Sequence, residues 1–132
     1  MARVFTPAGA RTLSLPGRLS REIVAGDRGA EHVSFRLVEI APQKSGEPRR
    51  GPHVHHSFEE CIYVLAGSGV TETEGVEYAV EAGDTILIAA GELHVTRATG
   101  NEPLRLLCFF PTADVGAGTK EFPSWDEARG RK

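Results

Sequence analysis

Four residues of metal-binding type occur at short, regular spacings in this chain. His53, His55 and Glu60 lie in one segment, and His94 follows in a second segment near Gly91. Two histidines at positions i and i+2 of a strand point to the same face of a sheet. Imidazole nitrogens with one carboxylate suit Fe, Mn, Ni, Co, Cu or Zn. We therefore predict that His53, His55, Glu60 and His94 bind one divalent metal ion, whose identity these residue types do not fix.

Composition places the chain among ordinary globular domains. It has 132 residues, 40% hydrophobic and 25% charged, which is enough for one domain with a single core. The formal net charge is -3, and the charges are mixed along the chain without a long basic run. These features argue against a nucleic-acid partner.

No segment has the pattern of a targeting or membrane sequence. The opening Met-Ala-Arg-Val-Phe lacks the apolar region of a signal peptide, and no apolar run is long enough to cross a bilayer. Cys61 and Cys108 both lie in apolar runs, where we expect buried free thiols rather than a disulfide. We expect a cytoplasmic protein without a membrane partner.

Short runs of β-branched, aliphatic and aromatic residues, separated by Gly, Pro, Asn and Asp, predict an all-β sandwich or barrel. Glu74-Gly75 has the form of a tight hairpin turn. The expected strands are Arg21–Val24, Val33–Ile40, Glu60–Leu65, Gly69–Thr73, Glu77–Val80, Thr85–Ala89, His94–Ala98 and Arg105–Phe110.

The two ends of the chain carry the weakest signals. Ser124-Trp-Asp-Glu127 has the form of a capping box and predicts a short C-terminal helix or tail. The first eighteen residues have scattered apolar positions and could add an edge strand, on this chain or a partner. A small barrel has little room for these terminal side chains, so we predict a homodimer that buries them across a two-fold interface. The residues concerned are Val4, Phe5, Leu13, Leu15, Phe122 and Trp125.

Both metal-binding segments resemble the two sequence motifs of the cupin superfamily. In the first, His53-Val-His55, four residues, Glu60, six residues and Gly67 match, although Glu47 stands at the position of the leading glycine. In the second, Gly83, Gly91 and His94 match at the family spacing, while Ala89 replaces a proline and Ala98 an asparagine. The six-residue distance to Gly67 favours Glu60 over its neighbour Glu59 as the ligand.

This resemblance implies a single cupin domain over residues 1–132, with a small barrel of the jelly-roll, or double-stranded β-helix, type. We expect the conserved barrel at about 33–110, an N-terminal arm at 1–20 and a C-terminal tail at 113–132. It also implies one divalent metal held by His53, His55, Glu60 and His94. We expect His56, next to the ligand pair, to be a surface residue or to support a ligand rather than to bind the metal.

Strand alternation predicts the walls of the pocket beside the metal. Ile62 and Val64 share the face of Glu60, and Thr96 and Ala98 share that of His94, so the nearest walls are apolar or small. Such walls suit an organic substrate with an apolar or aromatic part, although the same residues also suit a filled core. Tyr63 and Arg97 are expected to face away from the metal. On the expected strand Val33–Ile40, alternation places one of Arg36 and Glu39 toward solvent.

Three functions are consistent with this ligand set, because cupins include enzymes of many kinds and also binding proteins. The first is a mononuclear metalloenzyme, dioxygenase-like by resemblance to quercetinase-like cupins, in which Glu60 doubles as a catalytic base. The second is an isomerase, cyclase or lyase that uses the metal as a Lewis acid without O₂. The third is a module that binds or senses a small ligand without turning it over.

Overall fold

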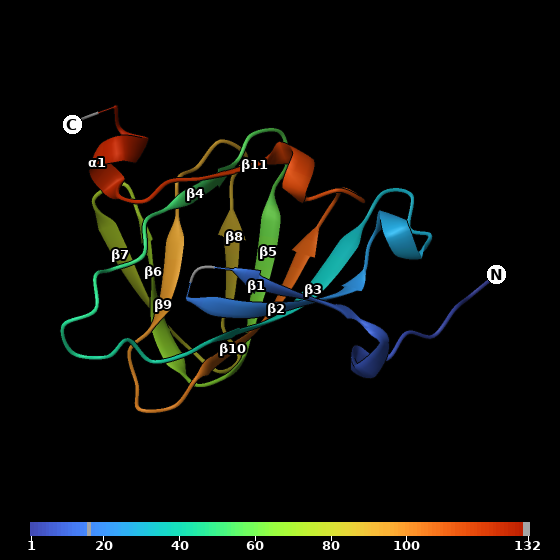
Figure 1. The fold of residues 1–132 in the computed structure, drawn as a ribbon, viewed down its shortest axis with the longest axis horizontal. Coiled ribbons are helices and arrows are strands. Elements are labelled where there is room, and N and C mark those ends of the chain that lie inside the picture. The colour runs from blue at the N-terminus through green and yellow to red at the C-terminus, as the bar shows by residue number, and fades with distance from the viewer. Residues whose placement is uncertain (16, 131–132) are drawn as a thin grey trace.

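The chain folds into a small barrel of antiparallel strands, which confirms the predicted all-β class (Figure 1). A computed structural model describes residues 1–15 and 17–130. A six-stranded sheet has the order β1-β2-β3-β10-β5-β8, and smaller sheets have the orders β7-β6-β9 and β11-β4. The strands are β1 (Arg11–Leu15), β2 (Arg18–Val24), β3 (Ser34–Ile40), β4 (His53–His55), β5 (Glu60–Ala66), β6 (Ser68–Thr73), β7 (Val76–Glu81), β8 (Thr85–Ile88), β9 (Val95–Ala98), β10 (Leu104–Phe110) and β11 (Thr119–Glu121).

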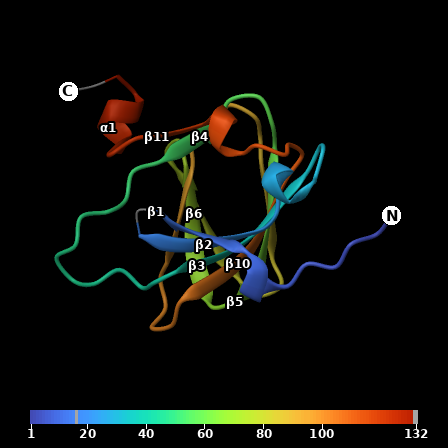
Figure 2. The same cartoon turned by 45° about the vertical axis from the view of Figure 1, so that its right-hand side comes forward.

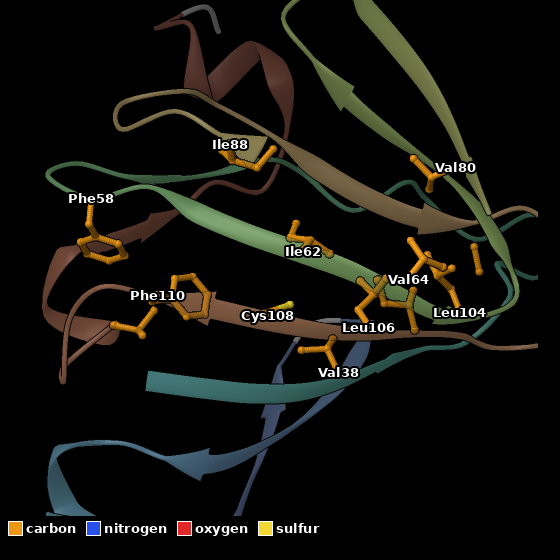
Figure 3. Packing of buried hydrophobic residues seen from close by; sticks show 13 residues of the cluster. Val38, Phe58, Ile62, Val64, Val80, Ile88, Leu104, Leu106, Cys108 and Phe110 are labelled. Carbon is orange, nitrogen blue, oxygen red and sulfur yellow. The ribbon is translucent and has the colours of Figure 1, made fainter. Parts of the chain in front are cut away.

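Strict alternation in β5 and β10 builds the core of the barrel. Along β5, Glu60, Ile62 and Val64 are buried, while Cys61 and Tyr63 between them are exposed. Strand β10 lies between β3 and β5 in antiparallel register and contributes Leu104, Leu106, Cys108 and Phe110 to the same interior. Figure 3 shows these side chains meeting inside the barrel. Both cysteines are free thiols as expected, but Cys61 is exposed because it occupies an outward position of β5.

The first eighteen residues contribute an edge strand to their own chain. Strand β1 pairs with β2 over its whole length, with Leu13 opposite Ser20 and Leu15 opposite Arg18. Leu13 and Leu15 therefore line the interior of this barrel. Val4, in contrast, is fully exposed. The homodimer stays a prediction, with fewer terminal side chains left for its interface.

Residues 113–130 of the expected C-terminal tail form regular elements, and residues 131–132 lie outside the part of the chain that the structure describes. Strand β11 pairs with β4, an interaction that the sequence did not predict because a three-residue strand carries no readable alternation. The predicted helix is present as α1 (Trp125–Ala128), and the Ser124 hydroxyl accepts a hydrogen bond from the Glu127 amide at 3.1 Å. Short 3-10 turns occur at Pro7–Gly9 (η1), Gly26–Arg28 (η2) and Gly116–Gly118 (η3).

The predicted turn at Glu74-Gly75 joins β6 to β7. Thr73 pairs with Val76 across it, and Gly75 has a φ of 75°, which favours glycine because it has no Cβ. This hairpin and β9 form the three-stranded sheet that faces the larger one (Figure 1).

We predict that Leu104→Ala destabilises the fold by about 2–5 kcal/mol, because it removes a fully buried side chain and leaves a cavity. Leu87→Ala is the matched control, since Leu87 is 62% exposed and its truncation changes stability by less than about 0.5 kcal/mol. Denaturant unfolding monitored by circular dichroism measures both. Equal losses for the two variants would contradict the assignment of the core.

Candidate metal centre

The fold brings the four predicted ligand residues to one point inside the barrel. His53 and His55 come from β4, Glu60 opens β5, and His94 immediately precedes β9. One potential ligand atom from each residue lies within 4.8 Å of all the others. His55, Glu60 and His94 are buried, with 3%, 4% and 1% of their surface exposed, and His53 is half-buried.

Backbone pairing on both sides of β4 fixes the two histidines. On one side β11 pairs with β4, placing Thr119 opposite His55 and Glu121 opposite His53. On the other side His53 and His94 form an antiparallel bridge with reciprocal N–H···O bonds of 2.9 and 3.0 Å. Strand β4 is therefore positioned by segments far away in sequence.

Neighbouring residues that could compete for the metal lie outside this cluster. Glu59 is exposed and Glu60 buried, as expected for consecutive residues at the start of a strand. His56 is also exposed. The register of β5 thus presents Glu60 to the interior.

Hydrogen bonds on the far side of two imidazole rings select their tautomers. Thr119 Oγ1 donates its proton to the Val115 carbonyl at 2.6 Å, so it accepts a bond from His55 Nδ1 at 2.8 Å. His94 Nδ1 likewise donates to the Glu92 carbonyl at 2.9 Å. In the neutral rings, Nε2 of both histidines therefore carries a lone pair directed toward the centre of the cluster.

These lone pairs converge on a carboxylate oxygen. Nε2 of His55 and Nε2 of His94 each lie 3.2 Å from Glu60 Oε1. Three acceptor atoms this close repel one another unless a proton or a metal cation lies among them. Adjacent ligands of an octahedral ion with bonds of about 2.1 Å are about 3 Å apart, which matches this spacing. The donor set therefore fits a divalent metal held by His53, His55, Glu60 and His94.

The electrostatics of the site favour the forms that bind metal. Burial alone would raise the pKa of Glu60, but when His55 and His94 carry a proton on Nε2, their hydrogen bonds and positive charge lower it far below the ordinary value. Burial, followed by the charge of His94, lowers the pKa of His53 well below 6.5. Glu60 is therefore an anion and His53 a neutral imidazole at neutral pH.

Two phenylalanine rings and one thiol lie next to the cluster. The Phe58 ring stacks on His55 with centroids 5.1 Å apart, and Phe110 meets the same ring edge-on, also at 5.1 Å. Cys108 lies beside Glu60, and burial followed by the charge of Glu60 raises the pKa of its thiol well above 9.0. Cys108 is therefore a protonated neighbour of the site and not a thiolate ligand.

A cavity of about 670 Å³ opens beside the four residues and extends along the inner face of the six-stranded sheet. Ile62 and Leu106 form an apolar wall, in which Ile62 was predicted from alternation on its strand. Strands β2 and β3 of the same sheet add a charged wall, whose residues were not among the predicted ones. Arg18, Ser20 and Glu22 line the cavity there, together with Arg36.

Alternation on β3 resolves which of its two charged residues faces inward. Glu39 is exposed, whereas Arg36 points into the barrel and bonds Glu22 at 2.9 Å. Arg97 is partly exposed and bonds Glu72 and Glu77, and Tyr63 is exposed, so both face away from the metal cluster as expected.

Sequence reasoning missed the charged wall and Thr119. Along β2, Arg18, Ser20 and Glu22 alternate with Leu19, Arg21 and Ile23. Each of these two faces contains polar or charged residues, so alternation alone does not show which face points inward. No local sequence pattern predicts the hydrogen bond of Thr119 with His55, because the two residues are 64 positions apart.

The sequence of this chain matches the profile of the cupin domain over residues 36–110, which is more than half of its length. The chain therefore belongs to the cupin family. It also shares 38% identity over 56 residues with an uncharacterized protein, MJ1618, of Methanocaldococcus jannaschii, a match spanning 42% of this chain and 45% of that relative. The matched segment thus covers less than half of the relative.

Solved structures with the same fold span the whole chain. The polyketide cyclase RemF of Streptomyces resistomycificus has a TM-score of 0.72 and 23% identity, covering 98% of this chain and 93% of its own. The nucleoside dehydratase Pac13 of Streptomyces has a TM-score of 0.76 and 10% identity, covering 97% of each chain. Oxalate decarboxylase of Lactobacillus farciminis has a TM-score of 0.72 and 20% identity, covering 87% of this chain and 34% of its own. At these identities the likeness is one of fold.

Among the described residues, no helix has both the length and the apolar character needed to cross a membrane. The expected cytoplasmic location stays a prediction.

We predict that His55→Ala abolishes binding of one divalent ion per chain, because it removes a buried ligand. His56→Ala is the matched control, since the adjacent exposed side chain lies outside the cluster. Metal content after dialysis, measured by inductively coupled plasma mass spectrometry, distinguishes the two. Unchanged metal content in His55→Ala would contradict the site.

Loss of the Thr119 hydroxyl is expected to weaken metal binding about 10- to 100-fold in Thr119→Val, because His55 then loses the partner that selects its tautomer. Thr99→Val, at an exposed position, serves as the control. Competition with a chromophoric chelator measures both affinities. A Thr119→Val protein with the affinity of the wild type would show that this hydrogen bond is dispensable.

The stability of the metal-free protein is expected to fall as pH drops below 6.5. The unfolded chain protonates His53 near its ordinary pKa of 6.5, whereas the folded chain, with the lowered pKa, stays neutral. Protons therefore bind the unfolded state more strongly across this window. His53→Asn should flatten the dependence of melting temperature on pH between 7 and 5.5, relative to the wild type. An identical slope in the variant would contradict this assignment.

Proposed function

We propose that this chain is a metal-dependent enzyme that acts on a small organic molecule. The observation that supports it is the placement of the four ligand residues at the wall of the cavity of about 670 Å³. Pockets of this size enclose small organic ligands. A structural metal site would instead be closed by its protein ligands.

The charge of the site suits electrophilic catalysis. Three neutral imidazoles and one carboxylate leave a divalent ion with one net positive charge. Such an ion supplies Lewis-acid polarisation of a substrate oxygen or a binding position for O₂. The neighbouring Phe58, Phe110 and Ile62 exclude water from one side of the cluster and so strengthen electrostatic interactions there.

Glu60 holds the metal in this proposal rather than moving protons. Its lowered pKa makes it a weak base, and both histidine contacts fix its Oε1 atom. The base role expected from the sequence requires the carboxylate to be released from these contacts, and it stays a prediction.

Chemistry without net oxygen incorporation is our preferred reaction class. Three structures of the same fold are named as a cyclase, a decarboxylase and a dehydratase, and none of these reaction types adds oxygen to its substrate. The charged wall offers cationic groups for an anionic substrate or intermediate. Dioxygenation is the second candidate, supported by the ligand set of three histidines and one glutamate that quercetinase-like cupins use.

A substrate screen with and without O₂ tests this proposal. Protein loaded with Fe(II), Mn(II), Ni(II) or Zn(II) is incubated with diketones, hydroxy acids, catechols and flavonols, and products are identified by mass spectrometry. We expect turnover under anaerobic conditions that is lost in His55→Ala and kept in His56→Ala. Turnover with matching O₂ uptake would support the dioxygenase instead. Ligand binding without any product would contradict an enzymatic role.

A further inference from the structure

Two half-buried arginines, Arg18 and Arg50, line the cavity that also contains His53. Arg18, the first residue of β2, reaches across the barrel to Glu121 of β11, with 2.6 Å between Nη2 and Oε1. Glu121 stands opposite His53 in the register of β11 and β4. Figure 2 shows β2 crossing the barrel below β4 and β11.

Arg50 approaches the same place from the segment that leads into β4. The Arg50 side chain passes beside Gly17, the residue that precedes Arg18, and the charge of Arg18 acts on the Arg50 guanidinium. The Arg50 guanidinium also donates to the carbonyl of Thr96, an inward residue of β9. Both arginines line the cavity that contains the metal cluster.

The proximity of two positive charges has an electrostatic consequence. Burial, followed by the charge of Arg18, lowers the pKa of Arg50 to about 10. A guanidinium in water keeps a higher pKa, so its charged form is disfavoured at this position. An anion beside Arg18 and Arg50 would relieve this repulsion.

Ser20 provides an independent observation on the same wall. Its Oγ atom is buried and has no hydrogen-bond partner among the described residues. Ser20 lies two residues from Arg18 on the inward face of β2 and lines the same cavity. A buried hydroxyl without a partner is costly in a folded protein, and a ligand acceptor would satisfy it.

The charge balance of the interior also favours an anion. The buried and half-buried charged residues of the lining are three arginines and two glutamates, and a divalent ion adds two further positive charges. These residues are Arg18, Arg36 and Arg50 on one side and Glu22 and Glu60 on the other, while Glu121 is exposed.

We propose that Arg18, Arg50 and Ser20 form a subsite for the carboxylate of a small organic acid, whose apolar body lies along Ile62 and Phe110 toward the metal cluster. This inference deepens the proposed function and depends on it for the role of the bound acid as substrate. The subsite itself requires only the cavity and its charged wall, so its binding can be measured in the metal-free protein.

The test uses 2-naphthoate and its neutral analogue 2-naphthamide, titrated calorimetrically into metal-free and Zn(II)-loaded protein. We expect wild-type protein to bind naphthoate about tenfold or more tightly than naphthamide in both forms, as for a charge-assisted contact. Arg50→Gln is expected to weaken naphthoate binding about tenfold or more and to leave naphthamide binding unchanged. Arg21→Gln, on the exposed face of the same strand as Arg18, is the matched control and should bind like the wild type.

Ser20→Ala keeps the proposal testable if Arg50→Gln folds poorly. This variant removes a hydroxyl without a partner, so its melting temperature should equal or exceed that of the wild type, while its naphthoate affinity falls several-fold. A purely structural role for Ser20 would not separate stability from binding in this way.

The outcomes distinguish this inference from the proposed function. Binding of naphthoate only to the Zn(II)-loaded protein, unaffected by Arg50→Gln and Ser20→Ala, would place the carboxylate on the metal and overturn the subsite alone. A second outcome is that naphthoate binds the metal-free protein, that this binding depends on Arg50 and Ser20, and that the metal-loaded protein turns over no acid. This result would support the subsite and contradict the enzymatic function. Equal affinity for naphthoate and naphthamide, or no binding of naphthoate to either form, would also overturn the subsite.

Discussion

The convergence of acceptor atoms inside the barrel is the constraint on which the site depends. His55 Nε2 and His94 Nε2 both approach Glu60 Oε1 at 3.2 Å, and the Nδ1 protons of both rings are already committed to Thr119 and the Glu92 carbonyl. A cation among these atoms converts their repulsion into attraction. The pKa values of Glu60 and His53 are lowered by different causes, contact with His55 and His94 for Glu60 and burial for His53, and both shifts favour the deprotonated forms that metals bind.

The barrel supplies this constraint through pairings between distant segments. Strand β4 has only three residues, so it depends on β11 on one side and on the His53–His94 bridge on the other. Glu60 opens the strand that lies between β10 and β8 in the largest sheet. Core side chains of β5 and β10 pack against one another (Figure 3), and β5 also carries Glu60, so the packed core fixes the strand that presents the carboxylate. Strands β2 and β3 of the same sheet contribute the charged wall of the cavity.

Much of this arrangement could be predicted from local patterns, and the remainder depends on contacts that are distant in sequence. Alternation predicted the inward face of β5, and the spacing of His53, His55, Glu60 and His94 predicted that they would be neighbours. The Thr119–His55 hydrogen bond and the Arg18–Glu121 ion pair join residues that are 64 and 103 positions apart, so no local sequence pattern could predict either contact. Charged residues at inward positions of β2 and β3 are stable only because they pair with each other across neighbouring strands, as Arg36 does with Glu22, and this pairing requires the sheet order.

The metal site can be tested by anomalous X-ray diffraction from crystals of the metal-loaded chain, with data collected on both sides of the absorption edge. We expect one anomalous peak per chain within about 2.0–2.2 Å of His55 Nε2, His94 Nε2, a ring nitrogen of His53 and a carboxylate oxygen of Glu60. A peak bound instead through exposed residues such as His32 or His56, or an empty cluster in crystals that contain the ion elsewhere, would contradict it.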